Sequence, residues 1–219
     1  MSSDKIVIFD WGGVVHSHEN NCLGMRQAIV RVAKRFGCQL DDEAILDGWQ
    51  KTVHLDNIHI DTIGRPEELQ KRLDYLSELW EVNIGFKKFK CIYEKENAEI
   101  PYYKDVVDFA HSLKSRCQIG ILSNLNYFSK KLIDENYNLS KFDHVYLSFE
   151  LGMRKPDREI YDFIQRDLNL PPENILFVDD IMENIVTAKE NGWQTCHATG
   201  RDLGHIKSTV EKFLDETRK

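Results

Sequence analysis

The segment that decides the fold is Lys5-Ile-Val-Ile-Phe-Asp10-Trp-Gly-Gly-Val-Val15. Its first half is apolar and rich in β-branched side chains, which is typical of a strand buried on both faces, as in a parallel sheet. Asp10 would then lie at the carboxyl end of that strand, where open α/β sheets place their ligands. Gly12 and Gly13 would let the backbone approach a ligand closely. An ordinary strand that ends at an aspartate before a glycine turn has the same pattern, so other segments must distinguish the two interpretations.

The composition excludes several classes of protein. With 219 residues, 42% of them hydrophobic and 30% charged, the chain can form a sizeable core and shows no sign of disorder. A net charge of −7 argues against nucleic acid as a partner. No apolar run approaches the roughly 20 residues of a membrane span, and the N-terminus lacks a signal-peptide layout. The five cysteines are odd in number and form no CxxC pair, which is typical of reduced thiols, so we expect a cytoplasmic protein.

Residues 16–99 have the texture of a helical unit. Helical periodicity predicts helices at 25–36, from 41, from 66 and over 86–96. Nothing in this part of the chain alternates as a strand would. We therefore interpret residues 16–99 as a separate helical domain inserted between the first strand and the rest of the sheet.

From Pro101 onward, helices and strands alternate. Strands are expected at 118–122, 144–147, 174–178 and 194–198, and helices at 103–114, 128–135, 157–167, up to 190, and 203–217. Strands separated by helices predict a parallel sheet with right-handed crossovers. The fold class is therefore α/β, with residues 1–15 and 100–219 forming a Rossmann-like parallel-sheet core that is flanked by helices.

Polar residues follow four of the predicted strands. They are Asp10, Ser123-Asn124, Lys155 and Asp179-Asp180. If the strands are adjacent and parallel, these groups converge at one edge of the sheet, where clustered carboxylates need a counterion. Oxygen ligands from a few carboxylates suit Mg²⁺, and the hydroxyl, the amide and the lysine suit phosphate oxygens. This set of groups indicates phosphoryl transfer through a covalent aspartate.

These segments resemble the motifs of the haloacid dehalogenase-like hydrolases over nearly the whole chain. Phe9-Asp10-Trp-Gly-Gly13-Val-Val is similar to the first motif of that superfamily, Leu122-Ser123-Asn124 to the second and Arg154-Lys155-Pro156 to the third. The run from Phe177 to Gly192 is similar to the fourth. Leu151-Gly-Met-Arg-Lys-Pro156 most resembles the α-D-glucose-1-phosphate phosphatase branch, and the phosphatase half of epoxide hydrolases is more distant. The inserted helices would be the helical cap of that family.

The resemblance implies a role for each residue. Asp10 would be the nucleophile and would hold Mg²⁺ together with Asp180, while Gly12 would contribute its backbone carbonyl. Asp179 would act through a water or as a weaker ligand. The groups that grip the transferring phosphoryl would be Ser123, Asn124 and Lys155. The expected substrate is a small phosphate ester, such as a hexose 1-phosphate.

One position departs from the family pattern. Most phosphatases of this superfamily carry a second aspartate two residues after the nucleophile, as general acid and base, and here that residue is Gly12. His16 and His18 lie close behind and could substitute for it, but we expect both to be exposed hinge residues.

Two other functions remain open. A phosphonatase-like C–P hydrolase would need a lysine in the inserted domain for a Schiff base, and Lys51 offers one. A non-catalytic relative that binds a phosphorylated metabolite would explain the missing acid. Substrate choice is expected to lie in the inserted helices, where the candidates are Trp49, His54, His59, Tyr75 and Trp80. The sequence leaves the oligomeric state open.

Overall fold

The structure is a computed structural model that describes residues 4–16, 21–97, 102–127 and 139–216. It divides into two compact units, which we treat separately. The first, here the sheet unit, comprises Met1–His18, Pro101–Asn124 and Leu139–Lys219. The second, here the helical unit, comprises Glu19–Ile100 and Leu125–Asn138.

The sheet unit is built on five strands in the order β5-β4-β1-β6-β7. Their bounds are β1 Ile6–Phe9, β4 Gln118–Ser123, β5 His144–Leu147, β6 Ile175–Asp179 and β7 Gln194–His197. Every neighbouring pair in this sheet is parallel. The expected α/β fold class with a parallel sheet is therefore confirmed.

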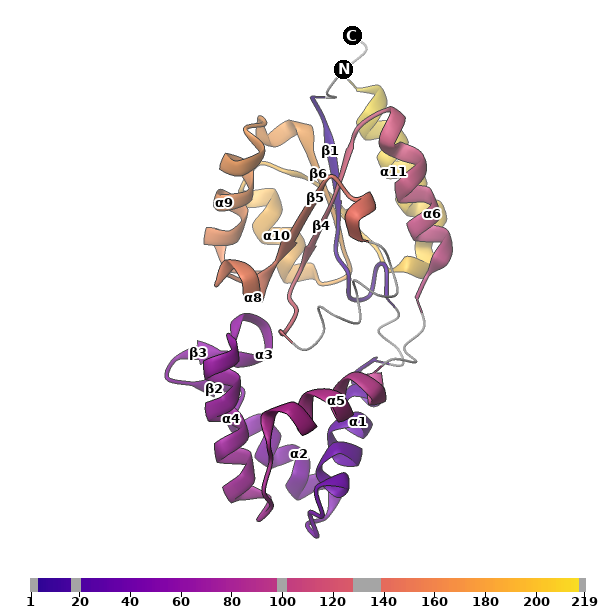
Figure 1. Cartoon of the computed structure of the whole chain (residues 1–219). Helices are drawn as coiled ribbons and strands as arrows, with labels where there is room; N and C mark the ends of the chain where they lie inside the picture. The colour runs from indigo at the N-terminus through magenta and orange to yellow at the C-terminus, as the bar shows by residue number, and fades with distance from the viewer. Residues whose placement is uncertain (1–3, 17–20, 98–101, 128–138, 217–219) are drawn as a thin grey trace. The chain divides into compact units, whose positions relative to one another are not determined.

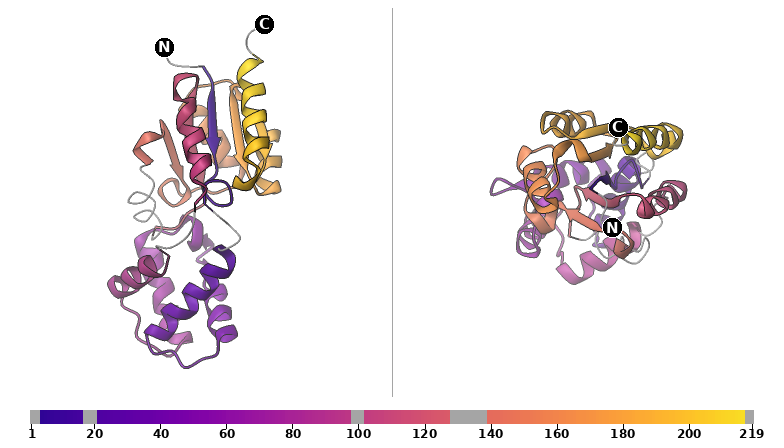
Figure 2. Two further views of the ribbon diagram at one scale, coloured as in Figure 1. Left: turned by 90° about the vertical axis from the view of Figure 1, so that its right-hand side faces the viewer. Right: turned by 90° about the horizontal axis from the view of Figure 1, so that it is seen from above.

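Helices cover both faces of this sheet (Figures 1 and 2). Their bounds are α6 Lys104–Ser112, α8 Ser148–Leu151, α9 Arg158–Leu168, α10 Met182–Glu190 and α11 Leu203–Asp215, with 3₁₀ turns at Leu113–Ser115, Leu139–Lys141, Pro172–Asn174 and Gly200–Asp202. Helices α9 and α10 lie on one side of the strands, and α6 and α11 lie on the other (Figure 1). All four residues of β1 are fully buried, as an apolar strand at the centre of such a sheet must be.

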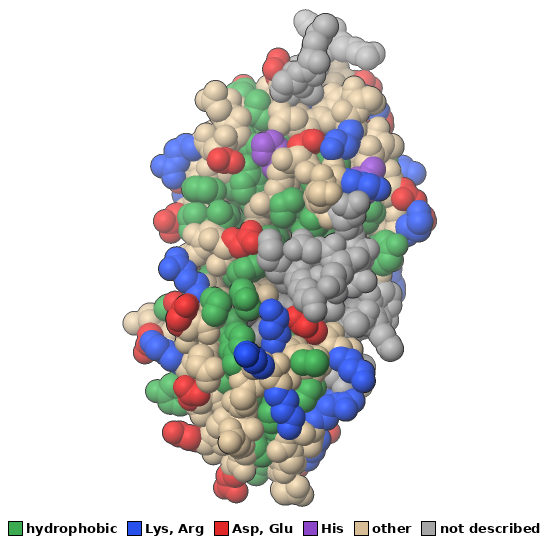
Figure 3. Space-filling model, in the orientation of Figure 1, with side chains coloured by type: hydrophobic (Ala, Val, Ile, Leu, Met, Phe, Trp, Pro, Cys, Tyr) green, Lys and Arg blue, Asp and Glu red, His purple; other side chains and the backbone are tan. Residues whose placement is uncertain are grey.

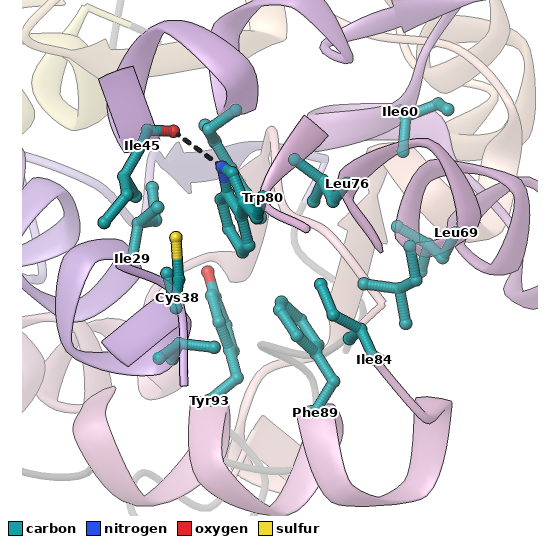
Figure 4. Packing of buried hydrophobic residues seen from close by; sticks show 14 residues of the cluster. Ile29, Cys38, Ile45, Ile60, Leu69, Leu76, Trp80, Ile84, Phe89 and Tyr93 are labelled. Carbon is teal, nitrogen blue, oxygen red and sulfur yellow. Dashed lines mark hydrogen bonds between the residues drawn. The ribbon is translucent and has the colours of Figure 1, made fainter. Parts of the chain in front are cut away.

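The helical unit has its own apolar core. Its helices are α1 Asn21–Arg35, α2 Asp42–Lys51, α3 Ile60–Ile63, α4 Pro66–Leu79 and α5 Phe86–Asn97. Figure 4 shows Trp80 at the centre of this core, where its Nε1 donates to the carbonyl of Ile45 at 3.1 Å. The guanidinium of the buried Arg72 lies 3.6 Å from the Trp49 ring centroid and donates to the hydroxyl of Thr52. The buried charge of Arg72 is therefore stabilised by a cation–π contact and by hydrogen bonds.

A hairpin in the helical unit contradicts the expectation that this part of the chain holds no strand. Strands β2 (His54–Leu55) and β3 (Ile58–His59) pair in antiparallel fashion. The turn between them has positive φ at both central residues, 53° at Asp56 and 63° at Asn57. Asp and Asn tolerate this conformation, which is that of a tight two-residue hairpin turn. Strands of two residues are too short to show alternation, so the pattern gave no signal.

The segment Leu125–Asn138 also differs from the expectation, which assigned it to the sheet domain. The structure groups it with the helical unit. Of its described residues, Tyr127 packs against the apolar cluster of that unit, and the Asn126 amide lies 3.2 Å from the Tyr93 hydroxyl. These contacts join positions distant in sequence, which periodicity cannot reveal. The helix expected at 128–135 lies outside the described residues.

Charge is unevenly distributed over the helical unit. Figure 3 shows Lys and Arg side chains gathered over α1 and α5. Helix α1 has four basic residues and no acidic one, and α5 has four lysines and two glutamates. The negative net charge of the whole chain therefore conceals a basic face.

Within the described residues, no helix is long and apolar enough to cross a membrane, and Cys38, Cys91, Cys117 and Cys196 are free thiols.

Candidate active site

The strand order brings the predicted polar residues to one edge of the sheet. Strand β1 lies between β4 and β6, and Phe9 is paired with Ile121 on one side and with Val178 on the other. Asp10 follows directly, and its backbone N–H donates to the carbonyl of Val178 at 2.8 Å. After β1 the chain builds outward through β4 to β5, then returns to β6 on the opposite side of β1. Ligand sites of open α/β sheets lie where the strand order reverses in this way.

Three carboxylates meet at this edge. Each of Asp10, Asp179 and Asp180 offers an oxygen, and these oxygens all lie within 4.8 Å of one another. Asp10 and Asp179 are buried, whereas Asp180 is half-buried. Like charges this close together are unfavourable in a low-dielectric interior, so the cluster requires compensating positive charge.

Lys155 supplies part of that charge. Its Nζ lies 2.9 Å from Asp10 Oδ1 and 2.6 Å from Asp179 Oδ2, and the side chain is 1% exposed. The two carboxylates raise the pKa of Lys155 against the opposing effect of its burial. One cation beside three carboxylates leaves an excess of negative charge.

The pKa of Asp10 is raised to about 7. Burial is the main cause, Lys155 opposes it, and the charges of Asp179 and Asp180 add to it. Oδ1 of Asp10 also accepts a hydrogen bond of 2.6 Å from the backbone N–H of Trp11. The carboxylate is therefore held in one orientation, and a further cation would favour its ionised form.

Asp179 is fixed by a dense set of donors. Asn184 Nδ2 lies 3.0 Å from both of its carboxylate oxygens, and the N–H of Ile181 donates to Oδ1 at 2.7 Å. Asn184 lies in the segment that resembles the fourth motif, and Ala188 follows it one turn later on the same helix face. Both residues are buried, and Asn184 in addition orients the carboxylate of Asp179. Its place in the first turn of the helix that follows the acidic pair was the signal available in the sequence.

Asn124 holds the loop that carries Lys155. Its Nδ2 donates to the carbonyl of Lys155 at 2.8 Å, and its Oδ1 accepts from the N–H of Lys155 at 2.9 Å. This reciprocal pair sets the position of the lysine. Nδ2 of Asn124 has a second hydrogen, which could donate to a phosphate oxygen. That contact stays a prediction for Asn124, and so does the phosphate contact expected of the buried Ser123.

Gly13 is required by the carboxylate of Asp180. Its φ is +75°, and a Cβ at this position would lie 2.2 Å from both Cγ and Oδ2 of Asp180. The carbonyl of Gly13 accepts from the N–H of Gly200 at 2.8 Å, which anchors the loop to the end of the sheet. Sequence analysis interpreted Gly13 as allowing a ligand to approach; the structure shows that it allows an acidic side chain to approach.

We predict that Gly13→Ala displaces the Asp180 carboxylate and weakens binding of a divalent cation by about tenfold or more, measured by isothermal titration with Mg²⁺. Gly37→Ala is the matched control, because Gly37 also has positive φ, +92°, but nothing lies within 4 Å of its added Cβ. Both variants carry the backbone strain of roughly 1–2 kcal/mol expected for a left-handed residue. Equal cation affinity in the two variants would contradict the steric argument.

Of the two histidines close behind the first strand, the structure describes His16, which differs from expectation. His16 is buried rather than exposed, and its ring stacks on that of Trp11 with centroids 6.5 Å apart. Its backbone carbonyl accepts from the N–H of Gly13 at 2.7 Å, so a tight loop places it inside. His18 lies outside the described residues. His197, which sequence analysis did not select, approaches the carbonyl of Asp180 with Nε2 at 3.0 Å.

Lys51 does not have the surroundings of a Schiff-base lysine. Its Nζ lies 2.6 Å from Asp47, and the side chain is 62% exposed. Reactive lysines are usually desolvated, because burial disfavours their charged form. The structure therefore gives the phosphonatase alternative no support.

Comparison with known proteins decides the family. The family described as haloacid dehalogenase-like hydrolase matches residues 5–192. The chain belongs to this family. The match spans the segments that carry Asp10, Ser123, Lys155 and Asp179, and it agrees with the resemblance drawn from their motifs.

Two relatives that align over most of their length are phosphatases. D-ribitol-5-phosphate phosphatase of Bacteroides thetaiotaomicron is 27% identical over 202 residues, 87% of this chain and 90% of the relative. A phosphorylated carbohydrates phosphatase of Thermotoga maritima is 22% identical over 94% of this chain and 90% of its own. A solved structure of a Bacteroides thetaiotaomicron family enzyme, in complex with magnesium and inorganic phosphate, has a TM-score of 0.66 and 25% identity, covering 92% of this chain and 98% of the other. The hydrolase described here is accordingly assigned as a phosphatase.

Proposed function

We propose that this chain is a Mg²⁺-dependent phosphomonoesterase that acts on small phosphorylated metabolites, in particular sugar or polyol phosphates, through an aspartyl-phosphate on Asp10. The observation that carries the proposal is the buried Asp10 carboxylate, which is oriented by Lys155 and lies beside two further carboxylates. The named activities of the relatives support the substrate class. Reduced-type cysteine usage supports a cytoplasmic location as part of the same proposal.

The donor set suits Mg²⁺. Mg²⁺ takes oxygen ligands and is commonly held by one or two protein carboxylates together with water and substrate phosphate. Asp10 and Asp180 would hold it directly, with the backbone carbonyl of Gly12. The carboxylate of Asp179 already accepts hydrogen bonds from Lys155 and from Asn184. This favours a role in which Asp179 contacts the ion through a water molecule. When bound, such an ion would neutralise negative charge on the phosphate.

The proposed reaction has two steps, in which different residues of this chain take part. An oxygen of Asp10 bonds to phosphorus while the bond between phosphorus and the leaving oxygen breaks, and the leaving oxygen takes up a proton. Water then hydrolyses the acyl phosphate and restores Asp10. Lys155, Ser123 and Asn124 would stabilise the charge that is spread over the phosphoryl oxygens during transfer. The helical unit would act as a cap that admits small substrates and excludes large ones.

The missing acid at position 12 predicts a dependence on the leaving group. Without a carboxyl there, the leaving oxygen lacks the usual proton donor of the family, and esters of more acidic alcohols should react faster. An anomeric hydroxyl is more acidic than a primary alcohol, so glucose 1-phosphate should exceed glucose 6-phosphate in kcat/KM. Ribitol 5-phosphate, the substrate named for one relative, has a primary leaving group and provides the opposing case.

The experiment compares these three esters with aryl phosphates of graded acidity. We expect kcat/KM to rise with leaving-group acidity, and Gly12→Asp to raise the rate of the poor leaving groups by roughly 10²-fold, the lower end for general acid catalysis. If the wild-type rates do not depend on leaving-group acidity, another residue supplies the proton. The buried His16 would be the first to replace.

The two adjacent aspartates should respond differently to substitution. Asp180→Asn should raise the Mg²⁺ concentration needed for activity by more than about tenfold, with little change in Tm, because the side chain is half-buried and would ligate the ion. Asp179→Asn should lower Tm, because it removes a buried charge that Lys155 and Asn184 contact and such losses cost roughly 3–5 kcal/mol. Mg²⁺ titrations of activity, with thermal unfolding in chelator, measure both effects. Identical behaviour of the two variants would show that their ranking is wrong.

A further inference from the structure

The β2–β3 hairpin presents two histidines side by side. His54 and His59 are direct cross-strand partners, and their ring centroids lie 4.3 Å apart with an interplanar angle of 80°. The adjacent pair, Leu55 and Ile58, packs against the apolar cluster of the helical unit. Because successive residues of a strand point to opposite faces, the two imidazoles lie on the face turned away from that cluster.

The backbone holds the two rings close together. In a two-residue hairpin the pair beside the turn is hydrogen-bonded, and the next pair is the closer, non-hydrogen-bonded one, with Cα atoms about 4.5 Å apart. His54 and His59 occupy that second pair, and the N–H of Ile60 donates to the carbonyl of Val53 just beyond it at 2.9 Å. At the turn, Asp56 lies 2.6 Å from Nζ of Lys71 on α4. The backbone pairing therefore keeps the two imidazoles close to one another.

Thr62 orients one of the rings. Its Oγ1 lies 3.0 Å from His59 Nδ1 and 3.5 Å from the carbonyl oxygen of His59. The hydroxyl can accept a hydrogen bond from Nδ1–H in the tautomer that carries its proton on that nitrogen. This tautomer places the lone pair of the ring on Nε2. Histidines that ligate metals usually donate their second ring N–H to a polar group in this manner.

We propose that His54 and His59 bind one divalent transition-metal ion of the Ni²⁺, Cu²⁺ or Zn²⁺ class, through one ring nitrogen each, with water completing the coordination. Imidazole suits these ions, whereas Mg²⁺ takes oxygen ligands. Histidine ligates a metal ion through an unprotonated ring nitrogen. This site differs in chemistry from the carboxylate cluster of the sheet unit, and it does not depend on the proposed function.

Isothermal titration of the full chain with NiCl₂, in saturating Mg²⁺ to occupy the carboxylate cluster, tests the proposal. We expect one Ni²⁺ per chain, with affinity lowered by about tenfold or more in His54→Gln and in His59→Gln, because each variant keeps only one of the two nitrogen ligands. Thr62→Val should weaken binding by roughly 10–100-fold and Thr62→Ser should restore it, as for other groups that orient a ligand. Electron paramagnetic resonance of bound Cu²⁺ should show two nitrogen ligands in the wild type and one in His54→Gln.

His205→Gln is the matched control, because His205 is an exposed histidine of the sheet unit on α11. It should leave Ni²⁺ affinity unchanged. His54 is itself exposed, so replacing it should not disturb folding, which circular dichroism checks. The proposal is overturned if the wild type binds no Ni²⁺, if the double variant His54→Gln, His59→Gln binds as tightly as the wild type, or if His205→Gln causes the same loss.

Discussion

Asp10→Asn is expected to lower kcat for phosphate esters by about 10⁴-fold or more, because an amide oxygen is a far weaker nucleophile than a carboxylate. Asn has nearly the shape of Asp and can still accept from the N–H of Trp11. The fold should therefore be retained. Burial of the Asp10 charge is unfavourable, as its raised pKa indicates, so the variant should keep or slightly raise Tm without Mg²⁺.

The measurement pairs single-turnover kinetics with thermal unfolding of the same sample. Mass spectrometry must show that no Asn has deamidated to Asp, since a small fraction of reverted enzyme would mimic residual activity. Asp108→Asn is the control, because Asp108 is an exposed carboxylate on α6 that pairs with Lys104, and its loss should leave kcat intact. Full activity of a pure Asp10→Asn variant would rule out the covalent mechanism.

Lys155→Met is expected to cause the second large effect, on activity and stability together. Removing this buried cation leaves Asp10 and Asp179 without their shared counterion. Loss of one partner from a buried charged pair costs roughly 3–5 kcal/mol. Because Lys155 is also the main group that lowers the pKa of Asp10, the nucleophile should then be protonated at neutral pH. We expect kcat to fall by about 10³-fold or more.

Two readouts separate these causes. The residual activity of Lys155→Met should increase with pH beyond neutrality as Asp10 ionises, and Mg²⁺ should recover part of the lost Tm by neutralising the carboxylates. Lys5→Met is the matched control: Lys5 is also buried in the sheet unit, where it donates to the carbonyl of Phe213 and lies over that ring. That variant should lose stability but keep its pH profile. A Lys155→Met enzyme with the wild-type pH profile would show that the lysine does not control Asp10.

Local pattern was sufficient for most of the strands and helices. Strand β1 is an uninterrupted apolar run that is followed by Asp10, and β6 is an apolar run that ends at Asp179. Both strands could therefore be predicted without any knowledge of their neighbours. Helix α4 begins at Pro66 with acidic residues in its first turn, which is a local signal as well. The parallel orientation followed because helices separate the strands. The convergence of Asp10 and Lys155 was expected only if the strands are adjacent, and the sheet order of the structure supplies that condition.

Contacts between distant segments were not visible in the sequence. The burial of His16, the bonds from Asn184 to Asp179, and the packing of Tyr127 in the helical unit all join positions that no periodicity connects. The β2–β3 hairpin was missed because two-residue strands have no measurable period.

The sequence by itself determined the α/β fold class, the parallel sheet, the family motifs and the residues that could carry phosphoryl chemistry, because runs of apolar residues and the polar groups that end them are local properties. Only the tertiary structure decided which of those groups contact one another. It showed that Lys155 is shared between Asp10 and Asp179, that Asn124 holds the backbone of Lys155, and that Gly13 makes room for Asp180. The physical reason is that charge compensation, burial and steric exclusion act between segments that only the folded chain brings together.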